Sequence, residues 1–406
     1  MDLVRLAWRN IWRNGKRTAI TASAIALNTA ILIVSYGLML GLVEQMVRTA
    51  TRMAVGDVQI HAQGFRSDRS LYKTIEHPDR ILAAARDKGL AAAARAQGFG
   101  LVSSGIKSSG AIFWGVDPAA EREAFEMPTQ LLQGSYLGEP ARHEVVLGLK
   151  LARSLRAEVG CEIVAVVQAA DGSLGNELFR VSGILKAISE DLDRTLAIVH
   201  RDDYATLFVA PGKIHEIAIW GRGALEPFEV VRRLDVAGAG EEMLTWQELQ
   251  PQLSALVQVY NVAIWIFGLV FLLAAGLGVM NTMLMATFER IREFGILKAI
   301  GTTPWRIVCD VALEAWMLAL VSTAVAVVLG GLGAWYLKIQ GLDLSIFSSR
   351  SFSIAGLAFQ TQWKGVLTVG VILIPVVAMW LVCVLSSLYP AVKAARLDPV
   401  RAIHHV

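Results

Sequence analysis

Residues 281–306 read NTMLMATFERIREFGILKAIGTTPWR, and this stretch decides how the rest of the chain is interpreted. It begins at the end of an uncharged apolar run, continues as a charged segment with helical spacing, and ends at Gly301-Thr302-Thr303-Pro304. A second apolar run follows almost at once. Glycine just after a helix, with proline beyond it, is a typical stop signal. The order predicts a short helix at a membrane surface between two membrane-spanning helices.

The composition also indicates a membrane protein. Hydrophobic residues make up 54% of the 406 residues and charged residues only 18%, which is more apolar and less charged than an ordinary soluble domain. Residues 18–43, 261–288, 315–337 and 365–392 contain no Asp, Glu, Lys or Arg. Since about 20 apolar residues cross roughly 30 Å of hydrocarbon, each run predicts a transmembrane helix. Residues 3–12 predict an amphipathic helix at the interface, unless the first span simply starts early.

Three of the segments that flank the spans are rich in Lys and Arg, and the positive-inside rule predicts that these segments are cytoplasmic. The predicted organisation is 1–17 cytoplasmic amphipathic helix, 18–43 first span, 44–260 extracytoplasmic domain with stalks, 261–288 second span, 289–306 cytoplasmic loop, 307–337 third span, 338–364 short outer loop, 365–390 fourth span and 391–406 cytoplasmic tail. The basic residues are Arg5, Arg9, Arg13, Lys16 and Arg17; Arg290, Arg292, Lys298 and Arg306; and Lys393, Arg396 and Arg401.

The outer segment 44–260 predicts a mixed α+β domain. Strand-like runs occur at 55–61, 110–116, 144–147, 162–168, 178–184 and 215–220, and helical spacing at 79–97 and 150–155. Asp171-Gly172 predicts a hairpin turn between two strands. Residues 44–54 and 241–258 are predicted to extend the first two spans outward as helical stalks. The segment has 28 acidic and 23 basic residues, a balance that is not typical of nucleic-acid binding.

The sequence contains no familiar catalytic motif. P-loop, HExxH, CxxC and GxSxG patterns are absent, so ATP binding by a P-loop is not expected. Cys161 is the single cysteine of the outer segment and cannot form a disulfide within it. Asp310 and Glu314 lie one turn apart near the cytoplasmic end of the third span, where contact with water or pairing with Arg306 is expected rather than a proton relay. Neither a metal site nor a catalytic residue is predicted.

Several segments resemble the MacB/FtsX/LolC-LolE family of ABC transporter permeases. Residues 289–301, ERIREFGILKAIG, resemble the family's cytoplasmic loop, which shows E-R-x-x-E-x-G-x-L-x-A-x-G after the second membrane helix. Residues 6–18, LAWRNIWRNGKRT, resemble its N-terminal helix, and residues 389–403, YPAVKAARLDPVRAI, its C-terminal tail. VGDVQIHAQGF (55–65) and VVLGLKLARSL (145–155) are most similar to the LolC/LolE-like, lipoprotein-release branch.

The resemblance implies a type VII ABC transporter permease. The expected fold is an α-helical membrane protein with four transmembrane helices plus a large α+β extracytoplasmic domain between helices one and two. The implied location is the bacterial inner membrane, with both termini cytoplasmic. The implied partners are a cytoplasmic ABC ATPase of the LolD or MacB type, a second permease copy or a paralogue, membrane lipid, and a lipoprotein or periplasmic adaptor. ATP and Mg would bind the ATPase, so the chain itself is expected to bind no cofactor and to be non-catalytic.

The same resemblance makes residues 289–300 a coupling helix that contacts the ATPase. Ile291, Gly295, Leu297 and Ile300 predict an apolar edge for a groove of the ATPase, with the charged residues setting the docking register. An ordinary positively charged loop without a partner is the alternative. The candidate coupling residues are Glu289, Arg290, Arg292, Glu293, Gly295, Leu297, Lys298, Ala299 and Gly301.

In the lipoprotein-release branch the first two helices line a cavity for acyl chains, so an apolar, adaptable lining is expected here. Lipid contact or helix packing would explain the same residues. Release or export of a lipophilic cargo is the first functional hypothesis, with lipoproteins ahead of peptides or drugs. An FtsX-like regulator of a periplasmic cell-wall hydrolase is the second. The cavity candidates are Met39, Leu42, Val43, Met46, Tyr260, Ile264 and Phe267, and the glycines expected at close helix contacts are Gly276, Gly278, Gly330, Gly331 and Gly333.

Overall fold

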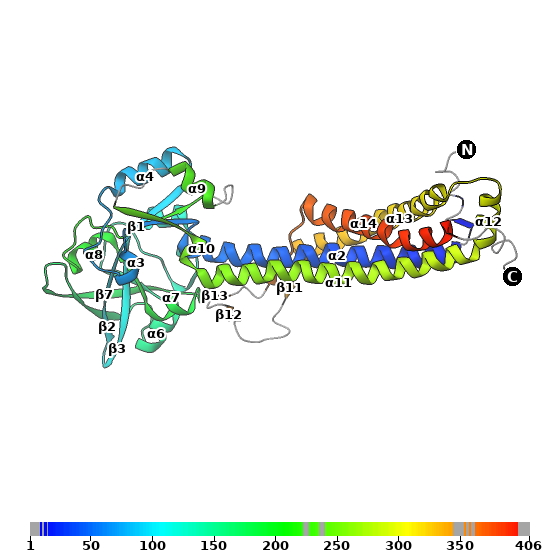
Figure 1. The fold of residues 1–406 in the computed structure, drawn as a ribbon. Helices are drawn as coiled ribbons and strands as arrows, with labels where there is room; N and C mark the ends of the chain where they lie inside the picture. Colours follow the sequence, from blue (N-terminus) through cyan, green and yellow to red (C-terminus); the bar gives the residue numbers. More distant parts are fainter. Residues whose placement is uncertain are drawn as a thin grey trace. The chain divides into compact units, whose positions relative to one another are not determined.

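The chain forms two compact units, seen in the computed structural model in Figure 1. The structure describes residues 9, 12–13, 15–221, 227–234, 240–343, 353–354, 357–358 and 362–396. The helical unit comprises residues 1–44, 257–347 and 362–406, and the α+β domain comprises residues 45–256 and 348–361. The predicted interfacial helix, residues 3–12, lies almost wholly outside the described residues. Residues 397–406 of the tail, which include Arg401, also lie outside them.

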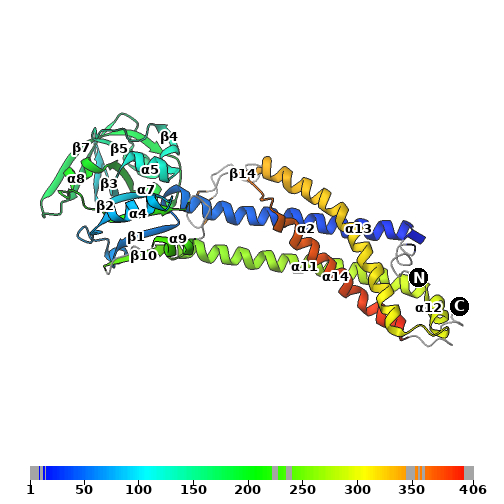
Figure 2. The same cartoon turned by 90° about the horizontal axis from the view of Figure 1, so that it is seen from above.

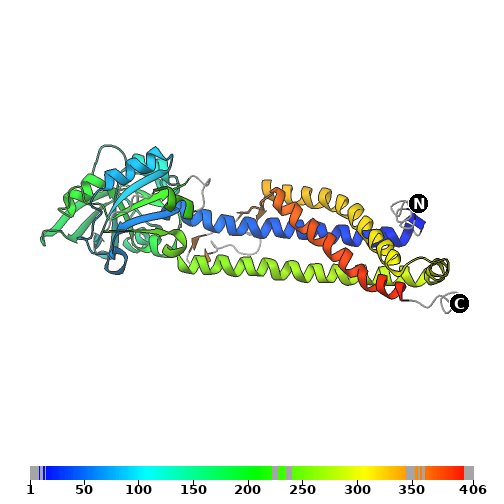
Figure 3. The same cartoon turned by 45° about the horizontal axis from the view of Figure 1, so that its top comes forward.

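Four long helices carry the four predicted spans. Each is long and apolar enough to cross a membrane, because the uncharged runs fall inside helices that extend beyond them. α13 and α14 pack against each other (Figures 2 and 3). Trp380 of α14 donates a hydrogen bond from Nε1 to Thr323 Oγ1 of α13 at 2.9 Å. The four long helices are α2 (Gly15–Ala50), α11 (Pro251–Glu289), α13 (Pro304–Ile339) and α14 (Val369–Ala395). The short helix α12 (Ile291–Ala299) lies between α11 and α13 in the sequence, and a short pairing joins β11 (Leu342–Asp343) to β14 (Gln362–Trp363).

Small residues allow close helix contacts at three of the five predicted glycines. A Cβ on Gly330 would lie 3.0 Å from Ala30 Cα, one on Gly333 2.9 Å from Val34 Cγ2, and one on Gly276 2.9 Å from Ser386 Oγ. These separations are too short for a larger side chain without movement of the neighbour. Gly278 and Gly331 face open space, so the prediction was wrong for them.

The α+β domain is built on one ten-stranded sheet. Six of its strands, β2, β3, β8, β5, β7 and β6, pair in a closed ring, with β3–β8 and β5–β7 parallel and the other pairs antiparallel. Phe113, Phe179 and Phe208 belong to the apolar core of this ring. The strands are β1 (Val58–Ala62), β2 (Ala91–Ser104), β3 (Lys107–Val116), β4 (Leu131–Gly134), β5 (Glu144–Leu147), β6 (Glu162–Gln168), β7 (Leu174–Leu185), β8 (Leu196–His200), β9 (Glu216–Trp220) and β10 (Glu241–Thr245).

Beyond β2 the sheet continues as β9, β1 and β10. Two helices, α4 (Pro78–Asp87) and α9 (Pro227–Leu234), pack on this part of the sheet through Ile81 and Val230 (Figure 1). The strand β2 therefore belongs both to the closed ring and to this extension. The remaining elements are η1 (Thr51–Val55), α3 (Phe65–Asp68), α5 (Pro118–Ala124), η2 (Met127–Thr129), α6 (Leu149–Leu155), α7 (Glu190–Thr195), α8 (Arg201–Leu207), α10 (Trp246–Leu249), β12 (Ser353–Ile354) and β13 (Leu357–Ala358).

The mixed α+β prediction is confirmed, but two segments differ from it. The Ala-rich helix predicted at 79–97 ends at Asp87, because Gly89 with φ +70° stops it, and residues 91–97 form β2 between β9 and β3. Pairing with β9 at residues 91–95 and with β3 from residue 95 onward outweighs the helix propensity of alanine here. The helix predicted at 241–258 begins with the strand β10, which covers the edge of β1. Beyond the first predicted span, α2 continues to Ala50 and a π-helical turn, η1, follows, so residues 44–54 are helical as predicted.

Candidate functional site

Non-helical backbone geometry at Arg290 and at Gly301 sets the two ends of α12. Arg290 leaves helical geometry at φ −109° and ψ 15°, which ends α11 at Glu289 and redirects the chain. At the other end Gly301 adopts φ +97°, and Thr302 N–H bonds back to Leu297 C=O at 3.0 Å. Glycine accepts this left-handed geometry without the cost that a side chain would add. The predicted short helix between two spans is therefore present.

Arg290 connects α12 to α13 through hydrogen bonds on the buried side of α12. Its guanidinium donates to Glu314 Oε2 at 2.9 Å and to Glu293 Oε2 at 3.0 Å, and it lies 3.8 Å from Asp310 Oδ2. The guanidinium carbon also lies 5.0 Å from the centre of the Phe294 ring. We refer to Arg290 and these three carboxylates as the Arg290 clamp. Asp310 and Glu314 were expected to contact water or to pair with Arg306. In the structure their cationic partner is Arg290, because the bend at residue 290 turns that side chain inward.

Further contacts fix both ends of α12. Burial alone would raise the pKa of Glu293, but hydrogen bonds from Arg290 and Arg13 lower it below its ordinary value. The Arg13 bond is 2.6 Å long and brings the start of the chain to α12. Lys298 Nζ donates to Ala395 C=O at the end of α14 at 2.9 Å. All these contacts lie within the helical unit, so α12 is presented in one fixed orientation.

The opposite side of α12 carries exposed apolar side chains. Ile296, Leu297 and Ile300 are exposed, Ile300 to 78%, and Trp305 beyond the turn is exposed as well. We call these four residues the α12 apolar edge. The predicted edge was partly different, because Ile291 and Gly295 are buried inside the helical unit. Contiguous exposed apolar residues next to charged ones are typical of an interaction surface.

The nine predicted coupling residues therefore lie partly on the buried side of the α12 segment and partly on its exposed side. Arg290 and Gly295 are buried, and Lys298 is half-buried. Arg290 thus serves internal structure rather than presenting its charge outward. The exposed residues are Glu289, Arg292, Glu293, Leu297, Ala299 and Gly301.

An apolar pocket of ≈ 400 Å³ lies between α2, α11 and α14 of the helical unit. Three of the cavity candidates, Met39, Ile264 and Phe267, line it. The contribution of α14 could not be predicted, because Pro375 lies 87 residues beyond the end of the predicted second span at residue 288 and nothing in the sequence links them. Of the other four candidates, Leu42, Val43 and Met46 are buried, Tyr260 is half-buried, and none of them lines the pocket.

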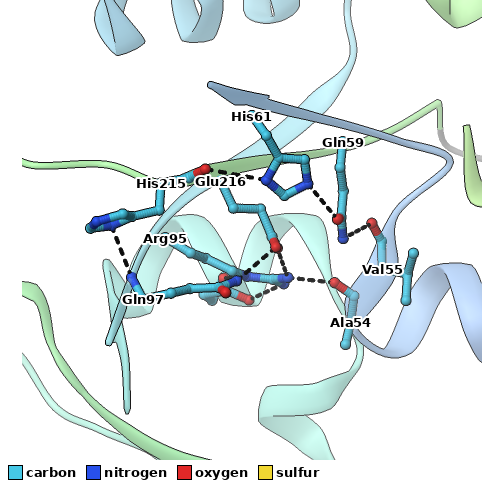
Figure 4. Close-up of polar contacts among 9 residues, drawn as sticks. Ala54, Val55, Gln59, His61, Arg95, Gln97, His215 and Glu216 are labelled. Carbon is cyan, nitrogen blue, oxygen red and sulfur yellow. Dashed lines mark hydrogen bonds and ion pairs between the residues drawn. The ribbon is translucent and has the colours of Figure 1, made fainter. Parts of the chain in front are cut away.

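In the α+β domain, a polar network surrounds the end of the first long helix (Figure 4). Arg95 on β2 is fully buried, and it donates from Nε to Glu121 Oε1 at 2.6 Å and from Nη1 to Glu216 Oε1 at 2.8 Å. Nη1 also donates to Ala54 C=O in η1 at 2.5 Å. This network was not predicted from the sequence, although a single arginine within an alanine-rich strand is itself an unusual signal.

His215, next to Glu216, is held in its neutral form. Its Nδ1 accepts the Gln97 N–H at 3.1 Å, which requires that its proton lie on Nε2, 3.0 Å from Leu71 C=O. Burial lowers the pKa of His215 below its ordinary 6.5. The imidazole therefore stabilises the fold above about pH 6.5, and this stabilisation is lost as the pH falls toward the lowered pKa.

We expect the free energy of unfolding of the α+β domain to fall between pH 7.5 and 5.5 through this group, because the unfolded state binds the proton more readily than the folded state. Hydrogen-exchange labelling of β9 during guanidinium denaturation of the full chain in detergent measures it. A His215→Gln variant should show a correspondingly flatter pH dependence. An equal dependence in both proteins would contradict the assignment.

Two family models match this chain. One, described as the MacB-like periplasmic core domain, matches residues 18–233, and one described as the FtsX-like permease C-terminal matches residues 265–399. The chain belongs to the MacB/FtsX family of ABC transporter permeases. The fold class predicted from the sequence is thereby confirmed, with four apolar helices and the large α+β domain between the first two.

Three relatives illustrate the range of this family. The permease is 26% identical over 296 residues to an uncharacterised ABC transporter permease of Methanocaldococcus jannaschii, covering 70% of this chain and 68% of that protein. It is 27% identical over 434 residues to the pyoverdine export ATP-binding/permease protein PvdT of Pseudomonas fluorescens, covering 99% of this chain but 59% of PvdT. It is 21% identical over 415 residues to the lipoprotein-releasing system transmembrane protein LolC of Xylella fastidiosa, covering 97% and 95%.

Proposed function

We propose that this permease receives force from a separate ABC ATPase through α12 and uses it to extract or export a lipophilic cargo, an acylated lipoprotein first. The observation that carries the proposal is the α12 apolar edge, held outward by the Arg290 clamp. A rigid helix can transmit force only if its orientation is fixed, and the Arg290 clamp fixes the orientation of α12 on its buried side. We further propose that α12 and both termini are cytoplasmic in a bacterial inner membrane and that two permease subunits form a dimer.

The apolar pocket supports a lipophilic cargo. Its lining combines methionine, isoleucine and aromatic side chains, which adapt well to an alkyl chain. The similarity to LolC, which extends over 95% of that protein, favours lipoproteins. The similarity to PvdT, a pyoverdine export protein, favours export of a pyoverdine-like molecule as the second candidate.

Purification of the full chain from native membranes tests the proposal, with proteins and bound lipids identified by mass spectrometry. We expect an ABC ATPase and an acylated molecule to co-purify. A periplasmic adaptor instead of a lipoprotein would favour efflux, and a cell-wall hydrolase would favour FtsX-like regulation. If no ATPase accompanies the chain, the proposal fails.

Replacing Leu297 or Ile300 with aspartate should reduce the co-purified ATPase about tenfold or more, because a charge would enter an apolar contact. Phe228→Asp is the matched control, since Phe228 is exposed to 73% on α9 of the α+β domain. Its ATPase yield should equal that of the wild type. Retention of the ATPase by both α12 variants would show that another surface binds it.

A further inference from the structure

The α+β domain binds the end of the α2–η1 helix by its backbone. The last carbonyl groups of a helix have no partner within the helix and are usually hydrated. Here Glu126 N–H donates to Arg52 C=O at 2.9 Å, Arg95 Nη1 to Ala54 C=O at 2.5 Å, and Gln59 Nε2 to Val55 C=O at 2.8 Å. Three carbonyls at the helix end are thus bound by groups from the loop before η2, from β2 and from β1. We call this arrangement the helix-end socket.

Arg95 is the most constrained member of the helix-end socket. Its guanidinium lies between two aromatic rings, 4.5 Å from the centre of Trp114 and 4.6 Å from that of Phe125. Burial opposes its charge, yet Glu121 and Glu216 raise the pKa of Arg95 above its ordinary value, so it stays charged. A positive charge is also favourable beside the carbonyl end of a helix.

The position of Arg95 in the sheet connects the helix-end socket to two parts of the α+β domain. It pairs with Glu216 of β9 on one side and with Val116 of β3 on the other. It therefore lies where the closed ring of strands meets the extension that carries α4 and α9. A displacement of η1 that moves Arg95 acts on both parts of the sheet. The π-helical geometry of η1 fits a point of adjustment, since such turns are frequent at functional sites.

We propose that Arg95 is the positioning residue through which movement of α2 is passed to the sheet of the α+β domain. The inference rests on the proposed function, because it needs an ATPase to move the helices. A role limited to fold stability would require only the carboxylates and the aromatic rings. The bond to the Ala54 carbonyl adds a contact whose acceptor belongs to the helix itself.

Arg95→Lys tests this inference in the full chain, purified in nanodiscs with its ATPase. Lysine keeps the charge but lacks the planar fork that reaches both carboxylates and the carbonyl. Hydrogen exchange of residues 51–56 should become about tenfold faster or more, with exchange in β8 unchanged. Gln59→Leu, which removes the bond to Val55 together with the contact between Gln59 Oε1 and His61 Nε2, should accelerate the same amides. Arg122→Lys is the matched control, because Arg122 donates to Leu137 C=O, an acceptor outside the helix.

The second readout is the response to ATP plus vanadate. In the wild type, exchange in β1 and β9 should change when the nucleotide is trapped; in Arg95→Lys this change should be lost while ATP turnover continues. An equal response in both proteins would overturn the role of Arg95 and leave the proposed function intact. Absence of any response or of the ATPase in the wild type would instead overturn the proposed function.

Discussion

Replacing Arg95 with methionine is expected to lower the free energy of unfolding of the α+β domain by about 3–5 kcal/mol. Methionine fits between the rings of Trp114 and Phe125 but leaves Glu121 and Glu216 buried without their cation. Removing one partner of a buried ion pair costs more than the pair itself contributes, because the remaining charge stays desolvated. Guanidinium denaturation of the full chain in detergent, followed by hydrogen exchange of β2 and β9, measures the loss.

The triple variant Arg95→Met, Glu121→Gln, Glu216→Gln supplies the control for this explanation. It removes all three charges, so most of the lost stability should return, even though the bond to Ala54 C=O is still missing. If the single and triple variants are equally unstable, the loss comes from packing or from the hydrogen bonds rather than from unpaired charge. An Arg95→Met protein as stable as the wild type would contradict the prediction outright.

Local sequence patterns predicted the elements whose stability is local. The uncharged runs predicted four helices because about 20 apolar residues have one stable arrangement in a bilayer. Asp171-Gly172 predicted its hairpin because the turn requires that pair of conformations; Gly172 has φ +84° between β6 and β7. Residues 91–97 were wrongly predicted as a helix because their strand geometry depends on β3 and β9, the latter more than 100 residues away.

The candidate sites also combine features that local sequence specifies with features that depend on distant segments. The residues of α12 were found from one contiguous motif, whereas the inward direction of Arg290 depends on the bend that precedes it. The helix-end socket joins residues from 52 to 126, and Glu216 extends the network further along the chain. The apolar pocket needs α14 as well as the two helices that the sequence indicated. Contacts between distant segments require the fold, because no local pattern specifies which segments become neighbours.

Replacing Arg290 with leucine is expected to detach α12 from α13 and to reduce ATPase co-purification strongly. The substitution removes the bonds to Glu293 and Glu314 at 3.0 and 2.9 Å and leaves a buried acidic side without that cation. Truncating one partner of a buried charged pair costs about 2–5 kcal/mol, which corresponds to a loss of thirtyfold or more in an equilibrium that needs α12 in place. Hydrogen exchange of residues 291–299 should become faster in the absence of the ATPase, since the clamp lies within the helical unit.

Arg292→Leu separates the internal role from direct docking. Arg292 lies two residues from Arg290 and is exposed, so its loss removes one positive charge, as Arg290→Leu does, but from the surface and without touching Glu314. Exchange in residues 291–299 should then match the wild type, whereas any weakening of ATPase binding should be modest and dependent on salt. Arg290→Leu combined with Glu314→Leu should recover part of the protection, because both charges leave the buried side together. Were Arg290→Leu to lose the ATPase with α12 exchange unchanged, Arg290 would act as a docking contact, as the sequence alone suggested, and not as the inner clamp.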